Sequence, residues 1–169
     1  IARSKELGAD QALEFLQDID AINLRARTRM IELVRRDLSE NLSGKKIAVL
    51  CASFKPDSDD VRDSPALDIS AQLQAAGADV WVHDPKAIEP ARKRFPALHY
   101  ADSIEDCLKD ADLVLHLTEW KVYREIDPTQ VKSLVKSPII IDGRNMLDRN
   151  KWIDAGWHFR ALGVTINQE

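Results

Sequence analysis

Short runs of apolar residues alternate with segments of helical pattern from Lys45 onward, and this alternation constrains the fold more than any other feature. The runs expected to form strands are Lys46–Leu50, Asp79–His83, Leu113–Leu117, Ile139–Asp142 and Trp157–Arg160, with a shorter one near Leu98–Tyr100. The helices expected between them are Pro65–Ala76, Ala87–Phe95, Ile104–Lys109, Pro128–Val135 and Asp148–Ala155. Nearly continuous apolar strands that alternate with helices form a parallel sheet covered on both faces. The sequence therefore predicts an α/β, Rossmann-like, doubly wound parallel sheet over residues 45–169.

A long segment without glycine or proline, Asp10–Leu42, precedes this region and predicts one long α-helix. Its apolar residues fall on more than one stripe, so the helix is expected to be buried on more than one side. One compact domain covers only one of those sides, and the other requires a further domain or a second subunit. Ser43 and Gly44 mark the expected boundary between residues 1–42 and 45–169. A helix end is also expected over Ile1–Leu7, stopped by Gly8.

Composition narrows the class of protein. The chain has 24 basic and 28 acidic residues, which gives no electrostatic case for nucleic acid as a partner. Its apolar runs are too short to span a bilayer, so no membrane partner is expected. Two cysteines without metal-type spacing fit a reducing compartment, and a cytoplasmic protein is expected. Because the first residue is Ile1 and not methionine, we expect a fragment of a longer protein.

The connection after the first predicted strand contains the segment Phe54–Pro65, FKPDSDDVRDSP. It spans about 13 residues before the next helix begins, whereas such loops usually have about 2 to 6. It contains no glycine, so the G-x-G-x-x-G dinucleotide turn is absent from the place where it belongs. Ligands of these sheets bind beyond the carboxyl ends of the strands, and Lys55 and Arg62 suit phosphate or carboxylate groups. A ligand-binding loop and a solvated loop held by internal Arg–Asp pairs both remain open.

Two further segments follow strands that end at the same edge of the predicted sheet. Arg144 lies directly after Asp142-Gly143, which places its charge near Lys55 and favours an anion site; the alternative is a capping turn with an exposed arginine. Trp120 follows the strand Leu113–Leu117. Its ring is predicted either to stack on a base or ribose or, more commonly, to pack at the rim.

The remaining candidates are interpreted as structural. His83 and His116 are expected to be packed or edge groups, and no histidine has metal-ligand spacing or belongs to a Ser-His-Asp set. Cys51 is expected to be a small core residue. A solvated or interdomain face of the long helix is expected from the arginine run Arg25, Arg27, Arg29, Arg35 and Arg36. No metal site and no catalytic residue are therefore assigned.

At the loop the sequence resembles a known family. KKIAVLCASFKPDSDDVRDSPALDI is very similar to the corresponding loop of the UDP-glucose/GDP-mannose dehydrogenase family. Three shorter segments resemble further family motifs in the right order: HDPKA (83–87), LTEW (117–120) and DGRN (142–145). The long helix, with DAIN at 20–23, resembles the family's central helix. The resemblance covers essentially the whole chain.

The resemblance implies a set of roles. Members of this family have an NAD-binding domain, a central helix that joins the domains and forms a homodimer, and a UDP-sugar-binding domain. They oxidise C6 of UDP-glucose twice with NAD, through a cysteine, to give UDP-glucuronate. Neither the glycine-rich NAD motif nor the cysteine motif occurs here, so the chain resembles the central helix and the UDP-sugar-binding domain. Phe54, Lys55 and Arg144 would bind the UDP-sugar, and Arg62 would reach across the interdomain cleft towards NAD.

Departures and alternatives accompany these roles. The family usually has glycine at Cys51 and commonly a small apolar residue at Ser53, so the loop is expected to differ slightly here. The motifs DGRN and LTEW together favour UDP-glucose over the GDP-mannose and UDP-N-acetylmannosamine of related dehydrogenases. A non-catalytic nucleotide-sugar-binding or dimerisation module is the alternative from another class. The sequence that precedes Ile1 in the natural reading frame would distinguish a module from an enzyme.

Overall fold

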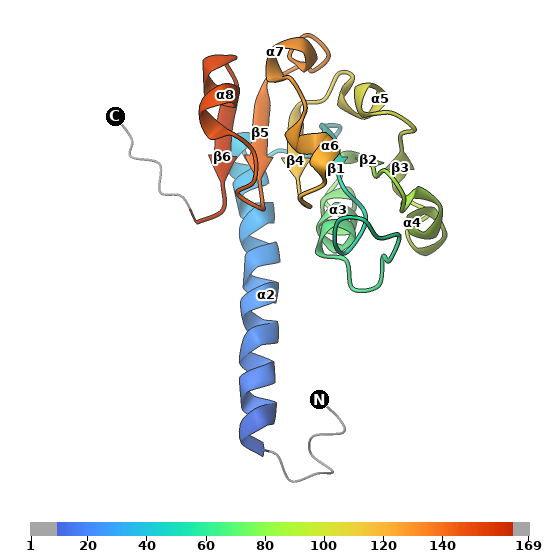
Figure 1. The fold of residues 1–169 in the computed structure, drawn as a ribbon, viewed down its shortest axis with the longest axis vertical. Coiled ribbons are helices and arrows are strands. Elements are labelled where there is room, and N and C mark those ends of the chain that lie inside the picture. Colours follow the sequence, from blue (N-terminus) through green and yellow to red (C-terminus); the bar gives the residue numbers. More distant parts are fainter. Residues whose placement is uncertain (1–9, 164–169) are drawn as a thin grey trace.

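A single parallel sheet forms the centre of the protein in the computed structural model, which describes residues 10–163 (Figure 1). The six strands follow the order β3-β2-β1-β4-β5-β6, and every neighbouring pair is parallel. Their bounds are β1 Lys46–Leu50, β2 Asp79–His83, β3 His99–Tyr100, β4 Leu113–His116, β5 Ile139–Asp142 and β6 His158–Ala161. This is the order of a doubly wound nucleotide-binding sheet, so the predicted fold class is confirmed.

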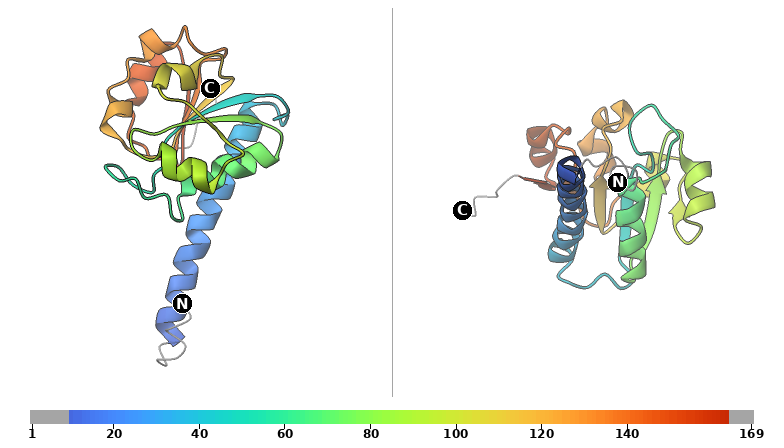
Figure 2. Two further views of the ribbon diagram at one scale, coloured as in Figure 1. Left: turned by 90° about the vertical axis from the view of Figure 1, so that its right-hand side faces the viewer. Right: turned by 90° about the horizontal axis from the view of Figure 1, so that it is seen from below.

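The helices that connect the strands are short. They are α3 Pro65–Ala75, α4 Ile88–Arg94, α5 Ile104–Leu108, α6 Lys121–Arg124, α7 Pro128–Val131 and α8 Arg149–Asp154. All five predicted connecting helices are present, although α7 ends four residues earlier than predicted. The four-residue α6 was not predicted, because it is too short to show a helical period. Long helix α2 and α3 lie side by side on one face of the sheet, and α7 and α8 lie on the other (Figure 2).

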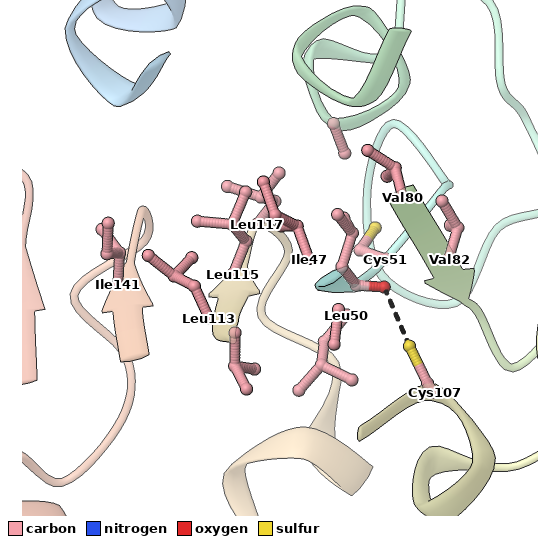
Figure 3. Close-up of a cluster of buried hydrophobic side chains, with 14 of the residues drawn as sticks. Ile47, Leu50, Cys51, Val80, Val82, Cys107, Leu113, Leu115, Leu117 and Ile141 are labelled. Atoms are coloured by element: carbon pink, nitrogen blue, oxygen red, sulfur yellow. Dashed lines mark hydrogen bonds between the residues drawn. The ribbon is translucent and has the colours of Figure 1, made fainter. Parts of the chain in front are cut away.

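The hydrophobic core lies on both faces of the two central strands. All of β4 and all but the first residue of β1 are buried, as expected for strands with helices on both sides. Side chains from β1, β2, β4 and β5 meet in this core, and the thiol of Cys107 points towards the carbonyl oxygen of Val49 at 3.9 Å (Figure 3). The alternation of apolar runs thus reflects burial on two faces.

Helix α2, Asp10–Asp37, ends five residues before the predicted Leu42. Ser39 and Glu40 adopt positive φ angles of 55° and 62°, the left-handed conformation that commonly terminates helices. The last turns are buried through Met30, Leu33, Val34 and Leu38. The preceding part, Asp10–Arg27, projects beyond the sheet, and we call it the arm (Figure 1).

An ion pair fastens the buried end of α2 to the last strand. Arg160 of β6 places its Nε 2.6 and 2.7 Å from the two carboxylate oxygens of Asp37, whose side chain is only 3% exposed. The predicted helix end at Ile1–Leu7 lies outside the described residues, and the division at residues 42–45 remains a prediction. Across residues 10–163, no helix is both long enough and apolar enough to cross a membrane.

Candidate functional site

A cleft lies at the carboxyl edge of the sheet, between the arm and the loops that follow β1 and β5. Its volume is about 350 Å³, within the range of small-molecule sites. The β1–α3 loop and the start of α3 contribute Phe54, Lys55, Pro65, Ala66 and Ile69. The segments that follow β4 and β5 contribute Leu117, Gly143 and Arg144. Helix α2 contributes Asn23, Ala26, Arg27 and Met30, and the remaining lining residue is Leu162. The site therefore combines cations with an apolar lining.

Three of the four predicted site residues meet in this cleft. Phe54 and Lys55 enter from the β1–α3 loop and Arg144 from the β5 loop, so the predicted convergence of two cations at one edge is observed. Phe54 is 52% exposed, which leaves its ring available for contact.

Arg62 lies elsewhere on the same loop. It does not line the cleft, its side chain is 80% exposed, and its Nη2 lies 2.8 Å from Oδ2 of Asp60. This hydrogen bond lowers the pKa of Asp60 to about 2. One end of the loop thus lines a cleft, and the other end is held by an internal Arg–Asp pair.

Arg144 is held by a bidentate pair with Glu119. Its Nε and Nη2 donate to the two carboxylate oxygens at 2.7 and 3.1 Å. The bond to Arg144 lowers the pKa of Glu119, so this carboxylate stays ionised at neutral pH. The pairing uses only part of the donor capacity of the guanidinium and fixes its orientation, which leaves further N–H groups for a ligand.

Arg27 is a cleft residue that the sequence interpretation missed. Its Nη1 donates to Asp68 of α3 at 3.0 Å, and its side chain is only 23% exposed. The solvated alternative is therefore wrong for Arg27, whereas Arg29 is 55% exposed. Spacing gave a signal, since Asn23, Arg27 and Met30 are three and four residues apart and share one face of the helix.

The other polar candidates are packed, as predicted. Trp120 is buried and its Nε1 donates to Oγ of Ser53 at 3.0 Å, so the ring packs beneath the loop. His83 is buried with its Nδ1 3.0 Å from the hydroxyl of Tyr123. Among residues 10–163, no group of three or more His, Cys, Asp or Glu side chains is arranged to hold a metal ion.

Cys51 follows β1 in a backbone conformation that favours glycine. Its φ is 135°, its side chain is fully buried, and its Sγ lies 3.2 Å from the carbonyl oxygen of Ser53. Burial raises the pKa of its thiol to about 12, so the predicted core role is confirmed. The positive φ explains why glycine suits this position.

Replacing Cys51 by glycine is expected to leave the protein about 1 kcal/mol more stable than replacing it by alanine, because only glycine adopts this φ without strain. Urea denaturation of the two variants measures the difference. Cys107 lies inside helix α5 and provides the matched control, because Cys107→Ala should be more stable there than Cys107→Gly. An alanine variant at Cys51 as stable as the glycine variant would show that the backbone is unstrained.

The strand order and the cleft beyond the strand ends define a nucleotide-binding type of α/β domain. Residues 48–149 match the family described as "UDP-glucose/GDP-mannose dehydrogenase family, UDP binding domain", and the chain belongs to this family.

Relatives in sequence and in structure agree with this assignment. The chain is 33% identical over 154 residues to a UDP-glucose 6-dehydrogenase of Rhizobium meliloti and 38% identical over 154 residues to one of Haloferax volcanii. These matches cover 91% of this chain but only 35% and 34% of the relatives, so the chain spans about a third of their length. A solved UDP-glucose dehydrogenase from Pyrobaculum islandicum matches with a TM-score of 0.73 and 26% identity, over 95% of this chain and 34% of that one.

Proposed function

We propose that the chain is the substrate-binding part of an NAD-dependent UDP-glucose 6-dehydrogenase, which oxidises UDP-glucose twice to UDP-glucuronate. The observation that carries the proposal is the meeting of Lys55 and Arg144 in one partly apolar cleft. A nucleotide sugar has two phosphates between two less polar ends, and a cleft of this kind matches that distribution of charge.

The anion-binding groups come from three elements. Lys55 supplies an ammonium, and Arg144 supplies a guanidinium that Glu119 orients. The start of the 11-residue helix α3 also lines the cleft, and the positive end of its dipole favours phosphate. The apolar side chains Phe54 and Ile69 offer contact surface to the base or the sugar. Binding and orientation of the substrate are therefore the roles that we assign to this chain.

The redox chemistry is assigned to other parts of the whole protein. Both cysteines are buried, and burial raises the pKa of each to about 12, so neither provides a thiolate. The β1–α3 connection has no glycine with which to cradle a pyrophosphate. NAD, which accepts the hydride when bound, would thus be held mainly by another domain, with Arg62 reaching it from this one. A cytoplasmic homodimer that pairs through α2 completes the proposal.

Replacing Lys55 by alanine is expected to weaken the binding of UDP about 10- to 100-fold, because hydrogen bonds to charged groups contribute about 1.5 to 3 kcal/mol. Titration calorimetry with UDP, UDP-glucose, UDP-N-acetylmannosamine and GDP-mannose measures the effect and the substrate preference together. We expect the uridine nucleotides to bind, UDP-glucose most tightly of the sugars.

The matched control is Lys93→Ala, which removes an exposed lysine of α4 outside the cleft. It should bind UDP like the unmodified protein. Equal affinity for UDP before and after removal of Lys55 would contradict the assigned role, and preference for GDP-mannose would transfer the proposal to the related dehydrogenases.

A further inference from the structure

A buried histidine–aspartate pair lies directly beneath the loop that presents Arg144. His116 is the last residue of β4 and Asp142 the last of β5, and the two face each other in the register of these neighbouring strands. Nδ1 of His116 lies 2.8 Å from Oδ1 of Asp142, and both side chains are fully buried. The pair belongs to the sheet, whereas the arginine above it belongs to the cleft.

Asp142 organises the backbone of this loop. Its Oδ1 also accepts a hydrogen bond from the N–H of Arg144 at 2.9 Å, and its Oδ2 accepts from the N–H groups of Met146 and Leu147 at 2.8 Å each. Between these bonds the chain passes through Asn145 at a φ of 55°. One carboxylate therefore holds the turn that carries Arg144 into the cleft.

We assign the proton of the pair to His116, because both oxygens of Asp142 already accept from backbone N–H groups. Burial raises the pKa of the Asp142 carboxyl, but the hydrogen bonds from His116 and the loop outweigh it and lower the pKa, so the group is an acceptor. Nδ1 of His116 must then donate. His116 Nε2 has no hydrogen-bond partner in the described part of the chain, although it is buried.

An unpartnered buried nitrogen is unfavourable. The preceding strand residues, Leu113–Leu115, fill the core without any such group. Leucine at position 116 would avoid the unpartnered nitrogen, so what histidine adds at this site is its Nδ1–H. That donor has a single partner, Oδ1 of Asp142. Its contribution is thus to hold the carboxylate in the orientation that the loop needs.

We propose that His116 is a positioning residue for the cleft: its bond to Asp142 fixes the loop 143–147 and so places the guanidinium of Arg144 opposite Lys55. The N–H of Gly143 also donates to the carbonyl oxygen of His116 at 2.9 Å, a backbone bond that side-chain variants at position 116 keep. This inference rests on the proposed function where nucleotide binding is the readout, but the order of the loop is measurable without any nucleotide.

The test compares His116→Asn, His116→Gln and His116→Leu. The amide nitrogen of asparagine occupies nearly the position of Nδ1 and can donate to Asp142, whereas that of glutamine corresponds to Nε2 and leucine has no donor. We expect the amides of Arg144, Met146 and Leu147 to exchange their hydrogens at least about tenfold faster in the glutamine and leucine variants. In calorimetry we expect these two variants to bind UDP about tenfold more weakly, with asparagine near the unmodified protein.

Two controls separate positioning from general destabilisation. Leu115→Ala weakens the core of the same strand without touching the pair, and it should leave the affinity for UDP unchanged. In an Arg144→Ala background, His116→Gln should cause no further loss of affinity, because the group it positions is gone. The inference is overturned if His116→Asn binds UDP as weakly as His116→Gln does. It is also overturned if His116→Gln weakens the binding of UDP further in the Arg144→Ala background. Absence of UDP binding by the unmodified protein would instead reject the proposed function, while unchanged exchange of the loop amides would still overturn the positioning role.

Discussion

Replacing Asp84 by alanine is expected to lower the free energy of unfolding by about 3 to 5 kcal/mol, one of the two largest effects that we predict. Asp84 follows β2 and is 3% exposed. Its Oδ2 accepts hydrogen bonds from the N–H groups of Ala52 and Ser53, and its Oδ1 accepts from those of Lys86 and Ala87, all at 2.8 to 2.9 Å. Alanine would leave buried donors without partners and release the start of the β1–α3 loop.

Urea denaturation followed by circular dichroism measures this loss. Asp84→Asn should lose less stability, because its remaining carbonyl oxygen still accepts two of the bonds. Asp102→Ala removes an exposed carboxylate and should change the stability by no more than about 0.5 kcal/mol. If Asp84→Ala were as stable as that control, the four hydrogen bonds would contribute nothing to the folded state.

The second large effect concerns the arm of α2. Its apolar side chains Leu16, Ile19, Ile22 and Leu24 are 38 to 57% exposed in the single chain. In the proposed homodimer this surface is covered by the second copy. Changing Ile19 and Ile22 together to aspartate would place carboxylates in that apolar contact, and we expect the protein to become a monomer in sedimentation velocity at concentrations where the unmodified protein is a dimer.

The stability of the single chain should hardly change, because both positions are exposed there. Ile153→Asp is the matched control, since Ile153 is 42% exposed on α8, away from the arm (Figure 1). It should leave the dimer intact. An unmodified protein that sediments as a monomer at high concentration would reject pairing through α2, whatever the outcome of the nucleotide titrations.

The sequence predicted the sheet well because its strands are buried on two faces and therefore consist of nearly unbroken apolar runs. The same physics predicted where the site lies, since loops at the carboxyl ends of parallel strands share one edge. That shared edge alone predicts that Lys55 and Arg144 lie in one cleft, and both line it. The difference between the long loop without glycine and an ordinary dinucleotide turn stays a prediction from the sequence.

What the sequence did not reveal depends on tertiary contacts. Periodicity identifies the faces of α2 but not its rotation against the sheet, so Arg27 was assigned to a solvated or interdomain face. The sequence did not predict that Asp84 and Asp142 organise the loops, although both belong to the family motifs. A carboxylate that accepts hydrogen bonds from several backbone N–H groups has no sequence pattern of its own. The positive φ of Cys51 likewise follows from the surrounding chain, and only the resemblance to a family with glycine there gave a hint of it.

The arm also has a mechanical consequence. A helix held at one end behaves as a stiff lever, and α2 is held between Met30 and Leu38 and by the clamp of Asp37 on Arg160. With a rise of about 1.5 Å per residue, Arg27 lies about 9 Å and Asp10 about 35 Å from a pivot at Leu33. A sideways shift of roughly 4 Å at the far end would thus move the cleft wall by only about 1 Å. A displacement of the outer arm would thus reach the cleft wall strongly reduced, so the spacing of the cleft residues is insensitive to it.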